Sequence, residues 1–292
     1  MPSNQTRRGL LWIACCWTLS FGLFMTSPSF AESTRSPAVE LYLLAGQSNM
    51  DGRGLSKDLS TDQRKPFSDA IIYYRNPPFA TDRFVSLAPG YSVAPGFKGK
   101  LPSSTFGPEI GFAQAMSKQA GPLLGLIKGS KGSTSLAGPW NPGEKGKIET
   151  QGDCYREFIT TIGLAEDNLR QQGQTFAIKG LLWHQGESDE NLSADDYAQR
   201  LTTFVNRIRE DLIAPNLPIA IGEVFDNGSA GRANVRAAQM QVASSTPFVT
   251  LVSADGLTTS DHGTHFDAAS QIILGTRFAA AMKQLQPASS KP

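Results

Sequence analysis

The fold is decided by the stretch Val39-Glu40-Leu41-Tyr42-Leu43-Leu44-Ala45-Gly46-Gln47-Ser48-Asn49-Met50. Its first seven residues are almost all apolar, which is typical of a strand that is buried on both faces of a parallel sheet. The run ends at a glycine, so Ser48 is expected at the carboxyl edge of the sheet, where open α/β sheets bind ligands. If a helix begins there, Ser48 lies at its positive end, although serine at such a position can also be a simple turn or cap residue.

Short apolar runs alternate with amphipathic stretches along the rest of the chain. The segments predicted as strands are 40–45, 70–75, 123–128, 178–183, 219–224 and 248–253, and those predicted as helices are 109–119, 155–172, 194–212, 230–244 and 268–285. Apolar strands separated by helices predict a mainly parallel sheet covered on both faces. Right-handed crossovers then give an α/β fold of the three-layer αβα sandwich type.

The first residues have the pattern of an export signal. Arg7 and Arg8 precede an uncharged apolar run over residues 9–25, and Ser29-Phe30-Ala31 offers a small-x-small cleavage site. We therefore expect residues 1–31 to be a signal peptide, residues 32–292 to form one domain, and the mature protein to be secreted or periplasmic. The apolar run is short for a membrane span, and an uncleaved anchor is the alternative.

Charge and cysteine content exclude several classes of protein. Loss of the two signal arginines takes the net charge from +1 to −1, which gives no electrostatic case for binding nucleic acid or an anionic membrane. The mature chain keeps one cysteine, Cys154, so it cannot form an internal disulfide. The fold must rest on its hydrophobic core, for which roughly 260 residues are ample.

Polar clusters follow two further strands of the predicted sheet. They are Trp183-His184-Gln185-Gly186-Glu187-Ser188-Asp189 and Ser260-Asp261-His262-Gly263-Thr264-His265-Phe266-Asp267. The chain thus places a serine, a glutamate and a histidine after three strands of one sheet. A serine hydroxyl becomes a nucleophile when an imidazole takes its proton and a carboxylate orients that imidazole. Fixed N–H donors must also hold the oxyanion that forms.

Together, the block around Ser48, the block around Glu187 and Gly263-Thr264-His265-Phe266 resemble the signature blocks of the sialate O-acetylesterase-like carbohydrate esterases. This family belongs to the SGNH hydrolase superfamily and includes the acetyl xylan esterases of carbohydrate esterase family six. The resemblance runs over about residues 39–282. It implies a flavodoxin-like αβα fold, no cofactor or metal, and removal of acetyl groups from sugars.

The same resemblance assigns roles to individual residues. Ser48 matches the nucleophile and His265 the base. The backbone N–H groups of Ser48 and Gly132 and the side-chain amide of Gln185 match the oxyanion hole. Gly132 lies in the segment Gly129-Ser130-Lys131-Gly132-Ser133-Thr134, where a glycine can also be needed only for a positive φ.

The acid of the triad has two candidates. Superfamily members often place an aspartate three residues before the histidine, but His262 occupies that position here and Asp261 lies one residue further back. Some family members are thought to use the glutamate of the second block, which is Glu187. We favour Glu187 over Asp261, although Glu187 can also cap a helix and Asp261 can also fix a turn.

Substrate contacts are expected from the long loops 76–107 and 129–152, which follow predicted strands. Trp140 is either a platform that stacks on a sugar or a core plug for its loop. Asn49, beside the nucleophile, is the second candidate substrate-binding residue. His184 is expected to be a packed structural histidine.

The leading functional hypothesis is a serine esterase acting on acetylated carbohydrate, with no nucleic acid partner and no stable membrane association after signal cleavage. A metal-dependent deacetylase is an alternative, because His262 and His265 stand three residues apart near acids, and imidazole with carboxylate suits zinc. A non-catalytic carbohydrate-binding relative is another, because His262 replaces the expected acid.

Overall fold

A sheet of eight strands, six of them parallel, forms the centre of the computed structural model, which describes residues 37–117, 121–261 and 263–286. The parallel strands lie in the order β3, β7, β1, β8, β9 and β10. Their bounds are β1 (Val39–Gly46), β3 (Ala70–Asn76), β7 (Leu123–Ser130), β8 (Phe176–His184), β9 (Ile219–Gly222) and β10 (Val249–Val252). Two short strands, β4 (Phe79–Ala80) and β5 (Val85–Ser86), pair antiparallel with β3 at one edge.

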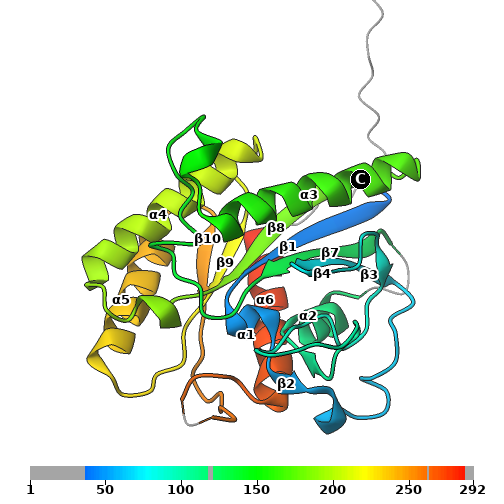
Figure 1. Cartoon of the computed structure of the whole chain (residues 1–292), viewed down its shortest axis with the longest axis horizontal. Helices are drawn as coiled ribbons and strands as arrows, with labels where there is room; N and C mark the ends of the chain where they lie inside the picture. The colour runs from blue at the N-terminus through cyan, green and yellow to red at the C-terminus, as the bar shows by residue number, and fades with distance from the viewer. Residues whose placement is uncertain (1–36, 118–120, 262, 287–292) are drawn as a thin grey trace, which may run out of the picture. The chain divides into compact units, whose positions relative to one another are not determined.

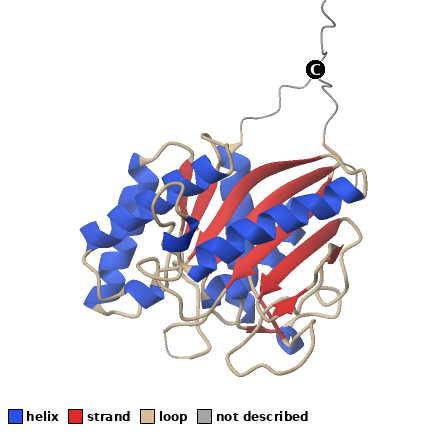
Figure 2. Ribbon diagram, turned by 45° about the horizontal axis from the view of Figure 1, so that its top comes forward, coloured by secondary structure: helices blue, strands red, loops and turns tan. Residues whose placement is uncertain are grey.

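Helices cover both faces of this sheet, as Figures 1 and 2 show. On one face lie α3 (Asp153–Gln171), α4 (Ala194–Asp211) and α5 (Ala230–Ser245). On the other lie α2 (Glu109–Met116) and α6 (Ala268–Leu285), which pack against each other. The expected three-layer αβα sandwich is therefore confirmed.

The apolar run of β1 is explained by its position in the middle of the sheet. Leu41, Leu43 and Ala45 are buried under α3, α4 and α5, whereas Tyr42 and Leu44 are buried under α2 and α6. Side chains alternate between the two faces of a strand, so a strand covered on both faces needs an apolar residue at every position.

All the predicted strands and helices are present, with ends shifted by a few residues. The short elements were not predicted. They are β4 and β5 at the edge of the sheet, α1 (Ser48–Asp51), β2 (Gly54–Leu55), β6 (Thr105–Phe106) and three 3-10 turns at Ser56–Asp58, Ile148–Thr150 and Glu187–Asp189. The strand order differs from that of flavodoxin in one respect, because β7 lies between β1 and β3.

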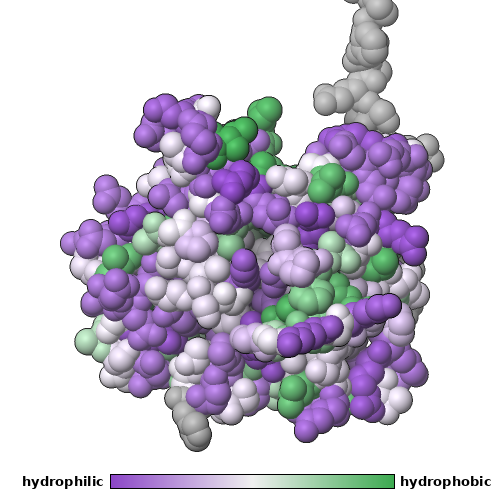
Figure 3. All heavy atoms as spheres, viewed as in Figure 1, coloured by the Kyte–Doolittle hydropathy of each residue, from purple (hydrophilic) through white to green (hydrophobic). Residues whose placement is uncertain are grey.

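The expected signal peptide, residues 1–31, lies outside the described residues and stays a prediction. The described residues, from residue 37 onward, belong to one compact unit. None of the helices that the structure describes is long and apolar enough to cross a membrane. On the face seen in Figure 3, hydrophobic residues form small separate patches on a mostly hydrophilic surface.

Candidate active site

The end of β1 places the candidate nucleophile. Gly46 has a φ of +145°, and a Cβ added there would lie 2.0 Å from the carbonyl oxygen of His184. Only glycine therefore allows β1 and β8 to end side by side at this point. The chain turns at once into α1, whose first residue is Ser48 (Figure 1). Ser48 thus lies at the carboxyl edge of the sheet, as the sequence predicts.

Three side chains from distant segments form a connected line at this edge. Ser48 Oγ lies 3.0 Å from His265 Nε2. His265 Nδ1 contacts Asp261 Oδ2 on the far side of the ring. Asp261 Oδ1 also accepts hydrogen bonds from the backbone N–H groups of His265, at 2.7 Å, and of Thr264, at 3.2 Å. This is the connectivity that a serine nucleophile, a base and an orienting acid require.

The charge of Asp261 is set by opposing influences. Burial alone would raise the pKa of its carboxyl group, but the hydrogen bonds from the His265 backbone and imidazole outweigh it and leave the pKa below its ordinary value. Asp261 therefore stays ionised beside the ring, which suits a group that stabilises an imidazolium.

Glu187, which the sequence analysis favoured as the acid, does not contact His265. Its Oε1 instead accepts a hydrogen bond of 2.6 Å from Asn49 Nδ2. It also lies 3.8 Å from Nδ1 of His184. The structure therefore favours Asp261 as the partner of His265, because the loop that carries both residues folds Asp261 back onto the ring.

Asn49 is fully buried and all of its side-chain groups are engaged, so it is not open to a substrate. Its Nδ2 donates to the Thr264 carbonyl at 2.9 Å as well as to Glu187, and its Oδ1 accepts from the Phe266 N–H at 3.0 Å. These contacts hold the peptide groups on both sides of His265. The expected substrate-binding role is replaced by a positioning one.

His184 is a packed residue, as expected. Its ring is fully buried, stands edge-on to Phe266, and makes no hydrogen bond within the described part of the chain. Burial lowers the pKa of its imidazole, against the opposing attraction of Glu187. His184 is therefore neutral and supports the loop that follows β8.

Gly132 lies directly against the nucleophile. A Cβ added at Gly132 would lie 2.8 Å from Arg53 Nη2 and 3.6 Å from Ser48 Cβ. Its φ is not positive, so close packing rather than backbone geometry explains the glycine. Neither the Ser48 N–H nor the Gly132 N–H donates a hydrogen bond to another described residue. Both are available to an oxyanion beside Ser48 Oγ.

Gln185 does not meet the expectation of a side-chain donor to the oxyanion. Its buried Nε2 donates to Asp189 Oδ2 at 2.7 Å, to the Thr134 carbonyl at 3.1 Å and to Gln47 Oε1 at 3.2 Å. Its Oε1 accepts from the Tyr197 hydroxyl. An amide has only two N–H groups, so none is left for a ligand. The buried carboxylate of Asp189 accounts for this orientation.

Trp140 packs into the hydrophobic core beneath its loop and does not present its ring to a sugar. Its side chain is 1% exposed and packs edge-on against Trp183, with ring centroids 5.1 Å apart, and against Phe158. Its Nε1–H donates to Thr134 Oγ1 at 2.9 Å. With 1% of its surface exposed and its polar atom occupied, the side chain offers almost no surface to a substrate.

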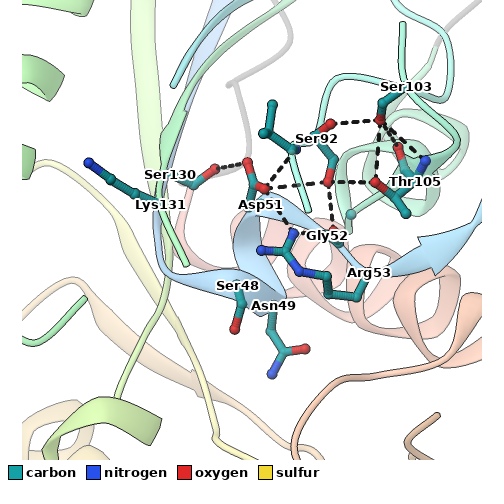
Figure 4. A network of polar contacts seen from close by, with 12 residues as sticks. Ser48, Asn49, Asp51, Gly52, Arg53, Ser92, Ser103, Thr105, Ser130 and Lys131 are labelled. Atoms are coloured by element: carbon teal, nitrogen blue, oxygen red, sulfur yellow. Dashed lines mark hydrogen bonds and ion pairs between the residues drawn. The ribbon is translucent and has the colours of Figure 1, made fainter. Parts of the chain in front are cut away.

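A buried polar network behind α1 was not predicted (Figure 4). Asp51 Oδ1 accepts hydrogen bonds from the Tyr74 hydroxyl at 2.8 Å and from Ser130 Oγ at 3.1 Å. Asp51 Oδ2 accepts from Arg53 Nη1 and from the Val93 N–H, both at 2.9 Å. The last residue of α1 is thereby tied to β3, β7 and the loop after β5.

A buried ion pair extends this network. Lys128 Nζ lies 2.7 Å from Glu109 Oε2 and donates to the carbonyl oxygens of Asp51 and Tyr91, so all three of its protons are used. Removing one partner of such a pair leaves an uncompensated buried charge. The signal in the sequence was a lysine inside an otherwise apolar strand.

The described residues hold no group of three or more His, Cys, Asp or Glu side chains that could bind a metal ion. His262, on which the zinc alternative partly depends, lies outside the described residues.

Comparisons with known proteins identify a family and a fold. Residues 38–284 match the family described as carbohydrate esterase, sialic acid-specific acetylesterase. A probable carbohydrate esterase of Arabidopsis thaliana is 27% identical over 272 residues, which cover 84% of this chain and 90% of that protein.

Solved structures share the fold. A protein from Arabidopsis thaliana has a TM-score of 0.67 at 24% identity, over 85% of this chain and 99% of that one. A carbohydrate acetylesterase from Xanthomonas citri has a TM-score of 0.60 at 15% identity, over 84% and 56% of the two chains. NanS has a TM-score of 0.59 at 16% identity, over 86% and 98%. The similarity to carbohydrate esterase family six stays a prediction. The match over residues 38–284 shows that this chain belongs to the sialic acid-specific acetylesterase family of carbohydrate esterases, which are carboxylic ester hydrolases.

Proposed function

We propose that this protein is a secreted or periplasmic serine esterase that removes O-acetyl groups from carbohydrate through an acyl-enzyme. The observation that carries the proposal is the 3.0 Å contact between Ser48 Oγ and His265 Nε2. Asp261 behind the ring and the membership of a carbohydrate esterase family support it further. The export pattern of residues 1–31 supports the location.

In the first step, Ser48 Oγ attacks the acetyl carbonyl carbon while its proton passes to His265 Nε2. Asp261 stabilises the imidazolium that forms. The carbonyl oxygen becomes an oxyanion that the N–H groups of Ser48 and Gly132 can hold, and each such donor is worth roughly a hundred- to a thousandfold in rate.

In the second step, the bond from the acetyl carbon to the sugar oxygen breaks, and the proton on His265 passes to that oxygen. This leaves the free sugar and an acetyl ester on Ser48. A water molecule then gives its proton to His265 and attacks the ester. The bond to Ser48 Oγ breaks, the serine recovers its proton, and acetate leaves.

The proposed substrate is an acetylated glycan, such as acetylated xylan or a related polysaccharide. The test is acetate release from a panel of acetylated glycans by the wild type and by Ser48→Ala. We expect release by the wild type and a fall in turnover of up to about a millionfold in the variant. Near-normal release by a folded Ser48→Ala protein would eliminate the serine mechanism. Binding of glycans without acetate release would favour a non-catalytic carbohydrate-binding relative. Loss of activity on chelation that zinc restores would favour a metal-dependent deacetylase.

A further inference from the structure

The oxyanion site beside Ser48 lacks one donor that the sequence predicts. Ser48 and Gly132 can each offer a backbone N–H, but the N–H groups of Gln185 are taken by acceptors within the protein, among them Asp189 and the Thr134 carbonyl. A side-chain amide is a common donor in oxyanion holes. The structure holds a second amide in contact with that of Gln185, on the residue before the nucleophile.

Gln47, the residue before Ser48, is fixed by its backbone. Its N–H donates to the His184 carbonyl at 2.9 Å, and its carbonyl accepts from the Asp51 N–H at 2.8 Å. The whole residue is only 3% exposed. Its position beside the nucleophile is therefore set before a substrate arrives, as a group that stabilises a transition state requires.

The amide of Gln47 has a single orientation. Its Oε1 accepts hydrogen bonds from Gln185 Nε2 at 3.2 Å and from the Ser188 N–H at 3.3 Å, and the Gly186 N–H contacts it at 3.5 Å. Three donors around one atom identify it as the oxygen, because the NH₂ group of an amide only donates. Nε2 is therefore the atom on the other side of the amide.

Nε2 of Gln47 is a donor without an acceptor. It makes no hydrogen bond to any residue that the structure describes, and it is not sealed inside the protein as the unpartnered ring nitrogens of His184 are. It thus reaches the surface at the carboxyl edge of the sheet, where Ser48 lies. Little water reaches so buried a residue, and an unused donor there costs free energy that an acceptor on a ligand would recover.

The contacts of Gln47 lead to the segment that carries Gly132. Gln185, which contacts the Gln47 amide, also donates to the carbonyl of Thr134, two residues after Gly132. A Cβ added at Gly132 would lie 3.6 Å from Ser48 Cβ, so this segment packs directly against the nucleophile. The free donor of Gln47 therefore belongs to the same small region as the two backbone N–H groups.

We propose that Gln47 Nε2 is the third donor of the oxyanion hole, in the role that the resemblance assigns to Gln185. When Ser48 Oγ bonds to the ester carbon, an electron pair of the carbonyl bond moves onto its oxygen. The N–H groups of Ser48, Gly132 and Gln47 hold this charge. The pair then returns to re-form the carbonyl, and the sugar oxygen leaves with the proton from His265. The proposal rests on the proposed esterase function and adds a catalytic residue to it.

Two substitutions separate the two ends of the Gln47 amide. Gln47→Glu keeps an oxygen for the N–H groups around it and removes the donor, whereas Gln47→Met removes both and keeps the length of the side chain. With 4-nitrophenyl acetate, we expect each variant to lower kcat about 10²- to 10³-fold, the cost of one oxyanion donor, with KM within a fewfold of the wild type. Gln172→Met, at an exposed glutamine after α3, is the matched control and should keep the wild-type kcat.

Phenylboronic acid distinguishes a catalytic role from a structural one. It adds to the serine hydroxyl as a tetrahedral anion that resembles the intermediate, so its dissociation constant reports the donors that face the oxyanion. We expect Gln47→Glu and Gln47→Met to weaken its binding by about the factor by which kcat falls. Unchanged boronate binding with a lower kcat would show that Gln47 only holds the loop after β8, and would overturn the proposal.

Gln185→Met compares the two amides. Its N–H groups are used within the protein, so we expect a smaller loss of kcat than in either Gln47 variant. A larger loss in Gln185→Met would return the role to Gln185. A wild type that cleaves no acetate ester overturns the proposed function and this role with it. A wild type that is active through Ser48, with kcat within about threefold of its value in both Gln47 variants, overturns the role of Gln47 alone.

Discussion

Asn49 donates a 2.6 Å hydrogen bond to Glu187. The same amide binds the carbonyl of Thr264 and the N–H of Phe266, which flank His265 in the chain. Glu187 therefore influences the position of His265 indirectly, by holding Asn49, which is adjacent to the nucleophile. The Asn49 side chain thus connects its own sequence block to the block of Glu187 and to the block of His265.

The two candidate acids should respond differently to loss of charge. Asp261→Asn is expected to lower kcat by about 10³- to 10⁴-fold, because the imidazolium loses its stabilising charge. Glu187→Gln keeps an oxygen that can accept from Asn49 and should cost less than about tenfold. Steady-state kinetics on an aryl acetate measures both. The reverse order of the two effects would return Glu187 to the triad.

Asn49 should affect catalysis without affecting substrate binding. Asn49→Ala frees both peptide groups beside His265, so we expect kcat to fall about 10- to 100-fold while KM stays within a fewfold of the wild type. Asn49→Asp should lower kcat at least as much as Asn49→Ala, because the new carboxylate cannot donate a hydrogen bond to Glu187 and repels its charge. Rescue by Glu187→Gln in the Asn49→Asp background would support the contact. A rise in KM with kcat unchanged would instead restore the substrate-binding role.

Trp140 should affect stability and not affinity for the substrate. Trp140→Ala empties a site between Trp183 and Phe158 and should lower the free energy of unfolding by roughly 3–5 kcal/mol. Trp140→Phe, which keeps most of the ring, should cost less. Denaturant unfolding gives the free energies, and KM for an acetylated glycan gives the affinity. An unchanged stability with a large rise in KM would indicate a sugar platform.

His184 should make the protein less stable in mild acid. Burial lowers the pKa of its imidazole in the folded protein. Below the ordinary histidine pKa of about 6.5, the imidazole therefore takes up a proton in the unfolded chain but not in the folded one. The free energy of unfolding should therefore fall as the pH drops below about 6.5. Urea titrations at a series of pH values should show a flatter dependence for His184→Gln.

Much of the fold could be predicted, because each parallel strand carries its own signal. The run that forms β1 is apolar at nearly every position, with Glu40 as the exception, because both faces of the sheet are covered. The place of Ser48 followed from the glycine that ends this run. Short elements such as β2 and β6 have two residues each, too few to show a period.

The roles of individual polar residues could not be predicted as well. Gln185 and Asn49 stand in the expected blocks, but their amides are taken by Asp189 and Glu187, which are neighbours only after folding. Trp140 in a polar loop gave no sign that it would pack against Trp183. Lys128 was visible as a charge in an apolar strand, yet its partner Glu109 is known only from the fold.

The central claim is that Ser48 is a nucleophile activated by His265. Labelling with an organophosphonate ester, followed by peptide mass mapping, tests it most directly. The account predicts one covalent adduct, on Ser48, formed at a rate that drops by orders of magnitude in His265→Ala. Acetate release by a protein that gives no adduct on Ser48 would contradict it, as would equal labelling rates with and without the imidazole.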